Sequence, residues 1–182
     1  MFGILADKLV LGFVSLGMLL FSSFEGNNAS FSKPYLIIEQ NHYEFSTYLE
    51  NAFVNDFNDI IHSGETIYID FELSLIEDTI NKKKIKFYHS VKYNAMEKSY
   101  ELYLDETKES LVFYQYESLI NQLSRVEYNF DEYDLNLKKI SLSASIRNLE
   151  LPTLKKNYDM MMLWNFKKPV LKIRIEDYTN EN

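Results

Sequence analysis

The sequence predicts an α+β fold, in which two helices pack on a mainly antiparallel sheet of about six strands, preceded by an N-terminal signal or anchor segment. Apolar and polar residues alternate in successive segments between residues 66 and 104, which is the period of half-buried strands. The 14 Tyr and 13 Phe also favour strands over helices. The run from Leu9 to Phe24 is apolar and uncharged, and it lies apart from these segments, near the N-terminus.

The N-terminal segment has the arrangement of a secretory signal. Lys8 precedes the uncharged run, and at Glu25 the run gives way to polar residues. The run is shorter than the ~20 apolar residues of a spanning helix, so cleavage near Ala29 and an uncleaved anchor both stay open. We therefore predict a signal peptide or N-terminal membrane anchor over residues 1–30. We expect an exported protein in the periplasm or cell envelope, held in the inner membrane if the segment is retained.

One domain is predicted after this segment, over residues 31–178, with a tail at 179–182. About 150 residues are enough for a single core. The net charge of -8 repels phosphate backbones, so we expect no nucleic-acid partner. Of the 5 glycines only Gly64 lies in this domain, whereas nucleotide-binding loops and nucleophile elbows need several. The chain has no cysteine, which rules out disulfides and a lipid-modified cysteine.

The first elements of the domain are a strand, a long helix and a second strand. Tyr35 to Glu39 is a short apolar run that predicts the first strand. From Glu44 to His62, apolar residues repeat at three- and four-residue spacing, which predicts a helix with a left-handed cap at Gly64. Thr66 to Ile76 alternates and predicts the second strand. We expect the main core where this strand meets the long helix, formed by Ile69, Phe71, Leu73, Phe53 and Phe57.

An antiparallel meander is predicted from this strand onward. Lys82 to Lys84 mark a turn, after which Ile85 to Tyr93 alternate as the next strand. A polar turn at Asn94 to Lys98 leads to a further strand at Tyr100 to Leu104. Successive strands joined by short polar turns pair as antiparallel neighbours.

The remaining elements are shorter. In order they are an extended run at Leu111 to Tyr114, a helix at Glu117 to Val126, an acidic loop at Asp131 to Asp134, a strand or bulge that starts at Lys138 and Lys139 and ends at Leu151-Pro152, and a last strand at Val170 to Ile175. The segment from Tyr158 to Phe166 fits a helix or a loop.

Several short motifs after the leader carry a family resemblance. They are a helix running into Ser63-Gly64, the strand Thr66 to Ile76, a later strand with Tyr100, the helix Glu117 to Val126, and Leu142 to Leu149 followed by Leu151-Pro152. In this order they resemble an uncharacterised bacterial exported-protein family, a domain of unknown function with a leader and one α+β domain. The resemblance implies export and the fold. Because that family has no assigned activity, it implies no site residues.

The histidines offer few candidates for chemistry. His89 is in phase with the apolar face of its strand, so we expect it in the core with one hydrogen-bond partner. His62 lies in the last turn of the predicted long helix, where an imidazole complements the helix dipole. His42, Glu39 and Glu44 are metal-ligand types without the spacing of a metal motif. We predict no catalytic, cofactor-binding or metal-binding residues.

Two carboxylates share the polar face of one predicted strand. Asp70 and Glu72 are residue types that serve in acid–base catalysis. Lysines on the next strand offer a simpler role, and we predict cross-strand ion pairs with Lys84, Lys86 or Lys92.

The candidate partner-binding residues are Met160, Met161, Met162 and Trp164. Adaptable thioethers beside an aromatic ring fit either a corner of the core or a surface that binds a partner. Core packing is the commoner role of such residues.

The expected function follows from scarce catalytic residues and Tyr-rich outer strand faces. We expect an exported, envelope-associated protein that binds an envelope protein as a non-catalytic binding or assembly module. The alternative is a periplasmic carrier of a lipid or another apolar ligand, which a closed apolar cavity would favour. The third is an enzyme of unrecognised class, which a cleft gathering His42 or His89 with carboxylates would favour.

Overall fold

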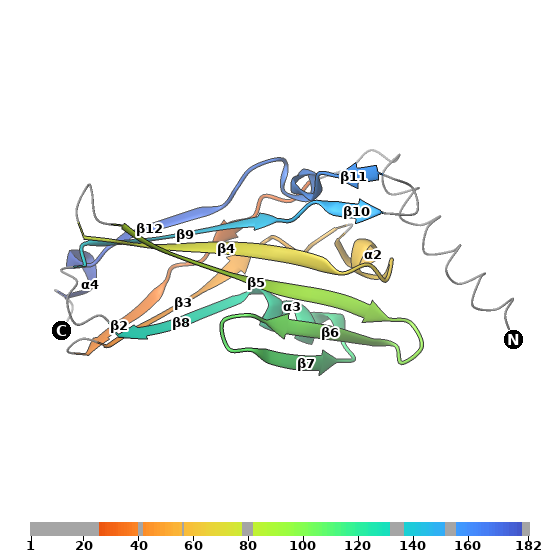
Figure 1. Cartoon of the computed structure of the whole chain (residues 1–182), viewed down its shortest axis with the longest axis horizontal. Coiled ribbons are helices and arrows are strands. Elements are labelled where there is room, and N and C mark those ends of the chain that lie inside the picture. The colour runs from red at the N-terminus through yellow and green to blue at the C-terminus, as the bar shows by residue number, and fades with distance from the viewer. Residues whose placement is uncertain are drawn as a thin grey trace, which may run out of the picture.

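The computed structural model describes residues 26–39, 42–55, 57–77, 82–131, 137–151 and 156–179. The apolar run of the predicted leader, most of the predicted acidic loop and most of the predicted tail lie outside these ranges. Within them the chain forms two main antiparallel sheets in two layers, accompanied by short helices (Figure 1). No helix in the described part of the chain is long and apolar enough to cross a membrane.

The larger sheet has six strands in the order β12-β9-β4-β5-β6-β7. They are β4 (Ile67–Ile76), β5 (Lys82–Asn94), β6 (Ser99–Leu104), β7 (Glu109–Phe113), β9 (Lys139–Ile146) and β12 (Val170–Arg174). From β4 to β7 each strand pairs antiparallel with the next, which is the predicted meander. Because β9 pairs with the other edge of β4, β4 is an inner strand of this sheet.

The smaller sheet is built around β3 (His42–Glu50). Three strands pair with it, all antiparallel: β1 (Ser30–Phe31), β2 (Tyr35–Glu39) and β8 (Arg125–Asp131). Two further strands, β10 (Leu149–Leu151) and β11 (Lys156–Tyr158), form a separate antiparallel pair.

The described helices are short. They are α2 (Phe57–Ile61), α3 (Tyr116–Ser124), the 3-10 helix η2 (Met160–Trp164) and α4 (Glu176–Thr179). α3 buries Leu119 and Leu123 and packs against β3, β6 and β7. After α2, Gly64 adopts a φ of 83° and its backbone N–H donates to the Ile61 carbonyl over 3.1 Å. This confirms the left-handed cap predicted at Gly64.

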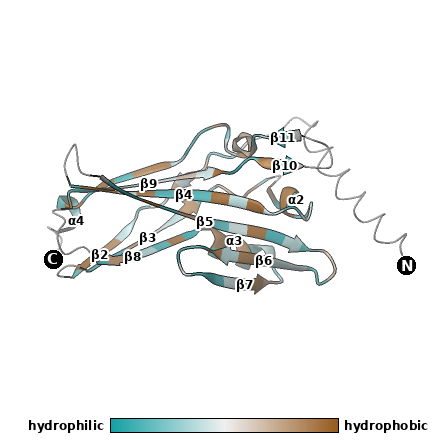
Figure 2. Cartoon of the chain, viewed as in Figure 1, coloured by the Kyte–Doolittle hydropathy of each residue, from teal (hydrophilic) through white to brown (hydrophobic). Residues whose placement is uncertain are grey.

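The core lies between the two sheets. Tyr128 of β8 stacks on Phe87 of β5 with ring centroids 5.6 Å apart, so the layers are in direct contact. Figure 2 shows hydrophobic and hydrophilic bands alternating along β4 and β5, as expected for strands with one buried face. All residues predicted to form the main core are buried: Ile69, Phe71, Leu73, Phe53 and Phe57.

The coarse fold prediction is confirmed, because the chain is mainly antiparallel sheet with a six-stranded sheet and short helices. The strands predicted at residues 35–39, 66–76, 85–93, 100–104 and 170–175 correspond to β2, β4, β5, β6 and β12. The break in alternation near Lys138 marks the start of β9. The helix predicted from Glu117 is α3, but it ends at Ser124 because the next residues enter β8.

The long helix predicted from Glu44 to His62 is wrong. Residues 42–50 form β3, and only Phe57–Ile61 is helical. The buried residues Phe45 and Leu49 are four apart, which suits a helix, but they are also two positions of an alternating strand. Pairing with β2 and β8 satisfies the backbone of this segment and selects the strand.

The turn predicted at Lys82 to Lys84 is also wrong. These residues belong to β5 and pair with residues 74–76 of β4. Lys84 is tolerated in the strand because its ammonium group reaches the surface and lies 2.8 Å from the Glu72 carboxylate. The ion pair predicted for Glu72 is thereby confirmed, whereas Asp70 pairs with Arg147 instead of a lysine.

Replacing Phe71 by Ala should lower the free energy of unfolding by about 3–5 kcal/mol, because a fully buried ring stacked on Phe87 would leave a cavity. Urea unfolding followed by circular dichroism measures the change. Val112→Ala, on the exposed side of β7, is the control and should change stability by less than about 0.5 kcal/mol. A loss below about 1 kcal/mol for Phe71→Ala would contradict the assigned core.

Candidate functional site

The outer face of the larger sheet carries a tyrosine stripe, which we define as Tyr68, Tyr88, Tyr103 and Arg147. The tyrosines come from the adjacent strands β4, β5 and β6, and Arg147 follows β9. Strand alternation turns these tyrosines away from the core, and each of the three is half-buried. The stripe therefore brings side chains from four segments onto one face.

The side chains of the stripe hold one another in place. The Tyr68 and Tyr88 ring centroids lie 5.6 Å apart, and those of Tyr88 and Tyr103 lie 5.8 Å apart. The Arg147 guanidinium carbon lies 4.4 Å from the Tyr68 ring centroid and 5.4 Å from that of Tyr88. These are distances at which cation–π attraction acts. The stripe is thus an ordered surface of aromatic rings and one guanidinium.

Arg147 is also fixed by a bidentate contact with Asp70. Its Nε donates to Asp70 Oδ2 over 3.1 Å, and its Nη2 donates to Oδ1 over 2.5 Å. This hydrogen-bonded carboxylate raises the pKa of Arg147, with a smaller contribution from the neighbouring phenols. The guanidinium is therefore held in one orientation, and its charge is locally neutralised by the carboxylate.

An open pocket of about 540 Å³ adjoins the Arg147 end of the stripe. Most of its lining residues are polar: Glu65, Thr66, Tyr68, Arg147, Asn148, Leu149, Glu150 and Asn157. Amide, hydroxyl and carboxylate groups of this kind can hydrogen-bond a polar side chain or an exposed peptide backbone. The pocket extends the stripe with a polar depression.

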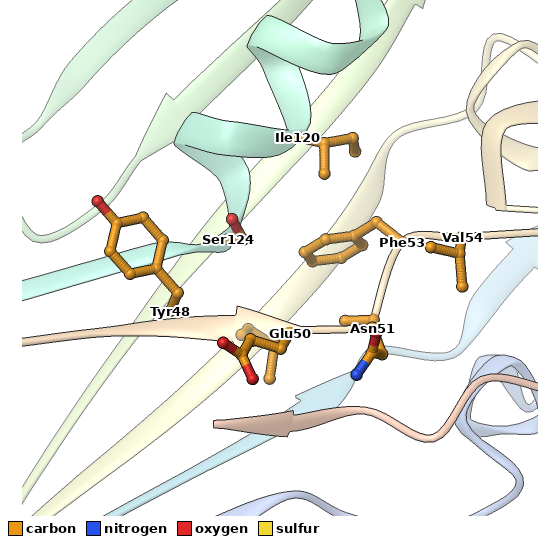
Figure 3. Close-up of a pocket in the computed structure, with 9 residues that line it drawn as sticks. Tyr48, Glu50, Asn51, Phe53, Val54, Ile120 and Ser124 are labelled. Atoms are coloured by element: carbon orange, nitrogen blue, oxygen red, sulfur yellow. The ribbon is translucent and has the colours of Figure 1, made fainter. Parts of the chain in front are cut away.

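A second open pocket, of about 460 Å³, lies where β3 runs into the following turn and faces α3. Figure 3 shows Ser124 of α3 between Tyr48 and Phe53, with Ile120 of α3 above them and Glu50 below. Its lining mixes apolar groups with polar ones such as Glu50. Neither this pocket nor the one beside the stripe is an enclosed apolar cavity.

The methionine and tryptophan segment predicted as a partner-binding surface forms η2. Met160 and Trp164 are buried, and the Trp164 Nε1–H donates to the Ala52 carbonyl over 2.9 Å. Met161 and Met162 are partly buried and pack on the core. Two of the four candidate residues therefore serve packing, and only the two partly buried ones reach the surface.

His89 and Glu106 form a buried pair. The side chains are 0% and 5% exposed, and His89 Nε2 lies 2.7 Å from Glu106 Oε1. His89 Nδ1 lies 2.9 Å from the Leu123 carbonyl, which can only accept, so Nδ1 carries a proton. His89 thus occupies the core as predicted, but with two hydrogen-bond partners rather than one, and it links β5 to the end of α3 and to the turn after β6.

His62 has a structural environment. Its Nδ1 lies 2.9 Å from the Asn58 carbonyl, and its Nε2 lies 3.1 Å from the Tyr100 hydroxyl. Since the carbonyl requires a proton on Nδ1, Nε2 accepts from Tyr100 when the ring is neutral. Burial raises the pKa of the Tyr100 phenol, which keeps it a donor. The predicted long helix ending at His62 does not exist, but the ring does lie at the end of α2.

His42 lies on the surface between two carboxylates. Its Nδ1 lies 2.7 Å from Asp131 Oδ1 and its Nε2 lies 3.5 Å from Glu44 Oε1. The hydrogen bond that His42 donates to the Asp131 carboxylate is the main reason why the pKa of His42 is raised. Glu39 is its backbone partner across β2 and β3. Among the described residues, no group of three or more His, Asp or Glu side chains is placed to hold a metal ion.

We expect His42 to titrate above its usual pKa of about 6.5 and Asp131→Asn to lower that value, because the main hydrogen-bonded carboxylate is lost. NMR titration of the His42 ring measures both. A raised folded-state pKa means that the pair stabilises the fold at pH below about 6.5 and that this contribution is lost as the pH rises through the folded-state value. An unshifted His42 in the unmodified protein would contradict the pairing.

Replacing Glu106 by Ala should lower the free energy of unfolding by about 1–3 kcal/mol, because it leaves His89 Nε2 buried without its hydrogen-bond partner. Urea unfolding measures the loss. Glu97→Ala, in the exposed turn before β6, is the matched control and should be nearly neutral. Equal stability of the two variants would show that the buried pair contributes nothing.

The sequence did not predict two features of this candidate site: the position of Arg147 and the contacts that order the tyrosines. Tyr68 and Tyr88 were already on predicted outer faces, so outward parity was the available signal. No family model, curated protein or solved structure matches the chain. The resemblance to an uncharacterised exported family stays a prediction, and what the protein does is inferred from its own side chains.

Proposed function

We propose that the protein is an exported, envelope-associated module that binds another envelope protein without chemistry of its own, and that the tyrosine stripe is its binding surface. The observation that carries this proposal is the row of half-buried tyrosines in ring-to-ring contact next to a fixed arginine on an outer sheet face. Tyr and Arg are the residue types, together with Trp, in which binding energy concentrates at protein interfaces.

The order already present in the stripe supports this role. Binding normally costs about 0.5–1.5 kcal/mol for each flexible side chain that becomes fixed. Tyr88 contacts both other rings, and Arg147 is fixed by Asp70, so little additional ordering is required. On binding, a surface arranged in this way loses less side-chain conformational entropy than the same side chains would lose if they were free to move.

The surroundings of the stripe resemble the polar rim of an interface. Glu72 pairs with Lys84 at 2.8 Å, and Lys108 pairs with Asp105 at 2.6 Å, both on exposed parts of the sheet and its turns. The hydrogen bond to Asp105 raises the pKa of Lys108, and the Tyr103 and Tyr88 phenols add to this rise. An aromatic centre with a rim of paired charges is the usual anatomy of protein interfaces.

The other expected functions have less support. A carrier of an apolar ligand needs an enclosed apolar space, whereas the two described pockets are open and of mixed polarity. An enzyme would need accessible groups in a cleft. His89 is sealed from solvent, and His42 lines neither pocket.

Photo-crosslinking from position 88 or 103 in intact cells would identify the partner, whose affinity for purified variants then tests the stripe. Tyr88→Ala and Tyr103→Ala should each weaken binding about tenfold, the effect of losing one interface anchor. Arg147→Lys should also weaken it, because an ammonium group lacks the planar fork that stacks on Tyr68.

Tyr114→Ala is the matched control, since Tyr114 is 74% exposed and lies after β7, outside the stripe. It should bind as tightly as the unmodified protein. Circular dichroism and urea unfolding show that each variant is folded. Unchanged affinity in folded Tyr88→Ala and Tyr103→Ala variants would refute the stripe as the binding surface.

A further inference from the structure

Asn27, three residues after the predicted leader's apolar run, is a buried part of the fold. Its side chain amide donates to the Val54 carbonyl over 2.9 Å and lies 3.3 Å from the Ala52 carbonyl. Its side chain oxygen accepts from Asn55 over 2.8 Å, and its backbone N–H donates to the Leu163 carbonyl over 2.8 Å. With an exposed fraction of only 4%, Asn27 is built into the domain.

These contacts join two segments that are far apart in the sequence. Asn27 forms hydrogen bonds with the turn that follows β3 and with the helix η2. The Ala52 carbonyl in that turn also accepts from the Trp164 ring of η2. Without Asn27, the Val54 carbonyl and the Leu163 carbonyl would lose these donors. A buried polar group that loses its partner is destabilising.

Gly26 is also fitted closely to the domain. Its carbonyl accepts from Asn165 Nδ2 over 2.9 Å. A Cβ placed on Gly26 would lie 2.2 Å from Asn165 Oδ1 and 2.9 Å from the Met162 carbonyl oxygen, so this close approach requires glycine. The following residues continue into the sheet, where Ser30 and Phe31 pair with β3. We call residues 26–31 the N-terminal seam.

The seam conflicts with processing at the predicted site. Cleavage after Ala29 would remove Gly26 and Asn27 and with them the contacts of the seam. Peptide bonds closer to the N-terminus also lack the small residues that signal cleavage needs at the last and third-last positions before the cut. Cleavage after Ser23 would place the bulky Phe21 at the third-last position, and cleavage after Ser22 would place Leu20 there. Gly17 and Ser15 have suitable sizes but lie inside the apolar run rather than after it.

We propose that the leader is not removed, so that Leu9 to Phe24 stays as a membrane anchor and the domain begins directly after it at the N-terminal seam. This inference rests on the proposed export of the protein. Only Glu25 separates the apolar run from Gly26, so the seam side of the domain lies at the membrane surface. The seam side of the domain therefore faces the lipid of the membrane.

The side chains around the seam suit that position. Val54, whose carbonyl bonds Asn27, is 49% exposed, and Phe166, next to Asn165, is 69% exposed. Lys167 follows and is also exposed. Apolar groups beside a cation are favoured at the boundary of an anionic lipid layer.

The N-terminus of the protein from its own cells tests the proposal. Membrane and soluble fractions are analysed by intact mass and N-terminal sequencing, and protease added outside the inner membrane reports on which side the domain lies. We expect the full-length protein in the membrane fraction with its domain open to the protease. A shortened N-terminus on an exported protein, at Ser30 or elsewhere, would overturn the anchor and leave the proposed function standing. A full-length protein protected inside the cytosol would overturn both.

The seam itself is tested in the full-length chain by Asn27→Ala. The urea midpoint should fall by on the order of 1 M, because the Val54 carbonyl loses a donor and the Asn55 amide loses its acceptor. Asn129→Ala, at an exposed position of β8 outside the seam, is the control and should leave the midpoint nearly unchanged. If Asn27→Ala is as stable as the control, the seam does not close the domain and the argument for retention fails.

Discussion

The structure depends on the alternation of β4 as an inner strand of the larger sheet. β4 is paired on both edges, so its side chains have only two directions available. Phe71 therefore lies in the core against Phe87, while Tyr68 and Asp70 lie on the outer face. A register shift of one residue would exchange these two sets. The pairing that builds the core thus also places the first ring of the stripe and the carboxylate that orients Arg147.

The same alternation explains which parts of the fold could be predicted. Strands such as β4 and β5 show a period of two over many residues, and no other period fits them. β3 was mistaken for a helix because Phe45 and Leu49 fit both periods, and the choice was made by pairing with β8, about 80 residues away in sequence. The outward parity of Tyr68 was predictable. Arg147 was not, because its contact with Asp70 joins positions 77 residues apart.

Buried polar contacts join the elements of this domain, which has no disulfides. The chain has no cysteine, and its elements are joined by hydrogen bonds in the interior. His89 joins β5 to α3, Trp164 joins η2 to the turn after β3, and Asn27 adds the seam. Each such hydrogen bond adds little net free energy to the stability, but removing one partner is costly because the other group is left buried and unsatisfied. The domain therefore depends on keeping all of these contacts, including those made by Asn27 in the N-terminal seam.

Under the proposed function, the stripe would bind its partner by direct contact rather than by long-range charge. The protein has a net charge of -8, and the guanidinium of the stripe is already neutralised by Asp70. Charge steering by Arg147 would be weak for this reason, and screening at physiological salt would reduce it further. An incoming carboxylate would also have to compete with Asp70. The proposed recognition would consequently rest on ring faces that are already ordered, and the shape of the partner would matter more than its charge.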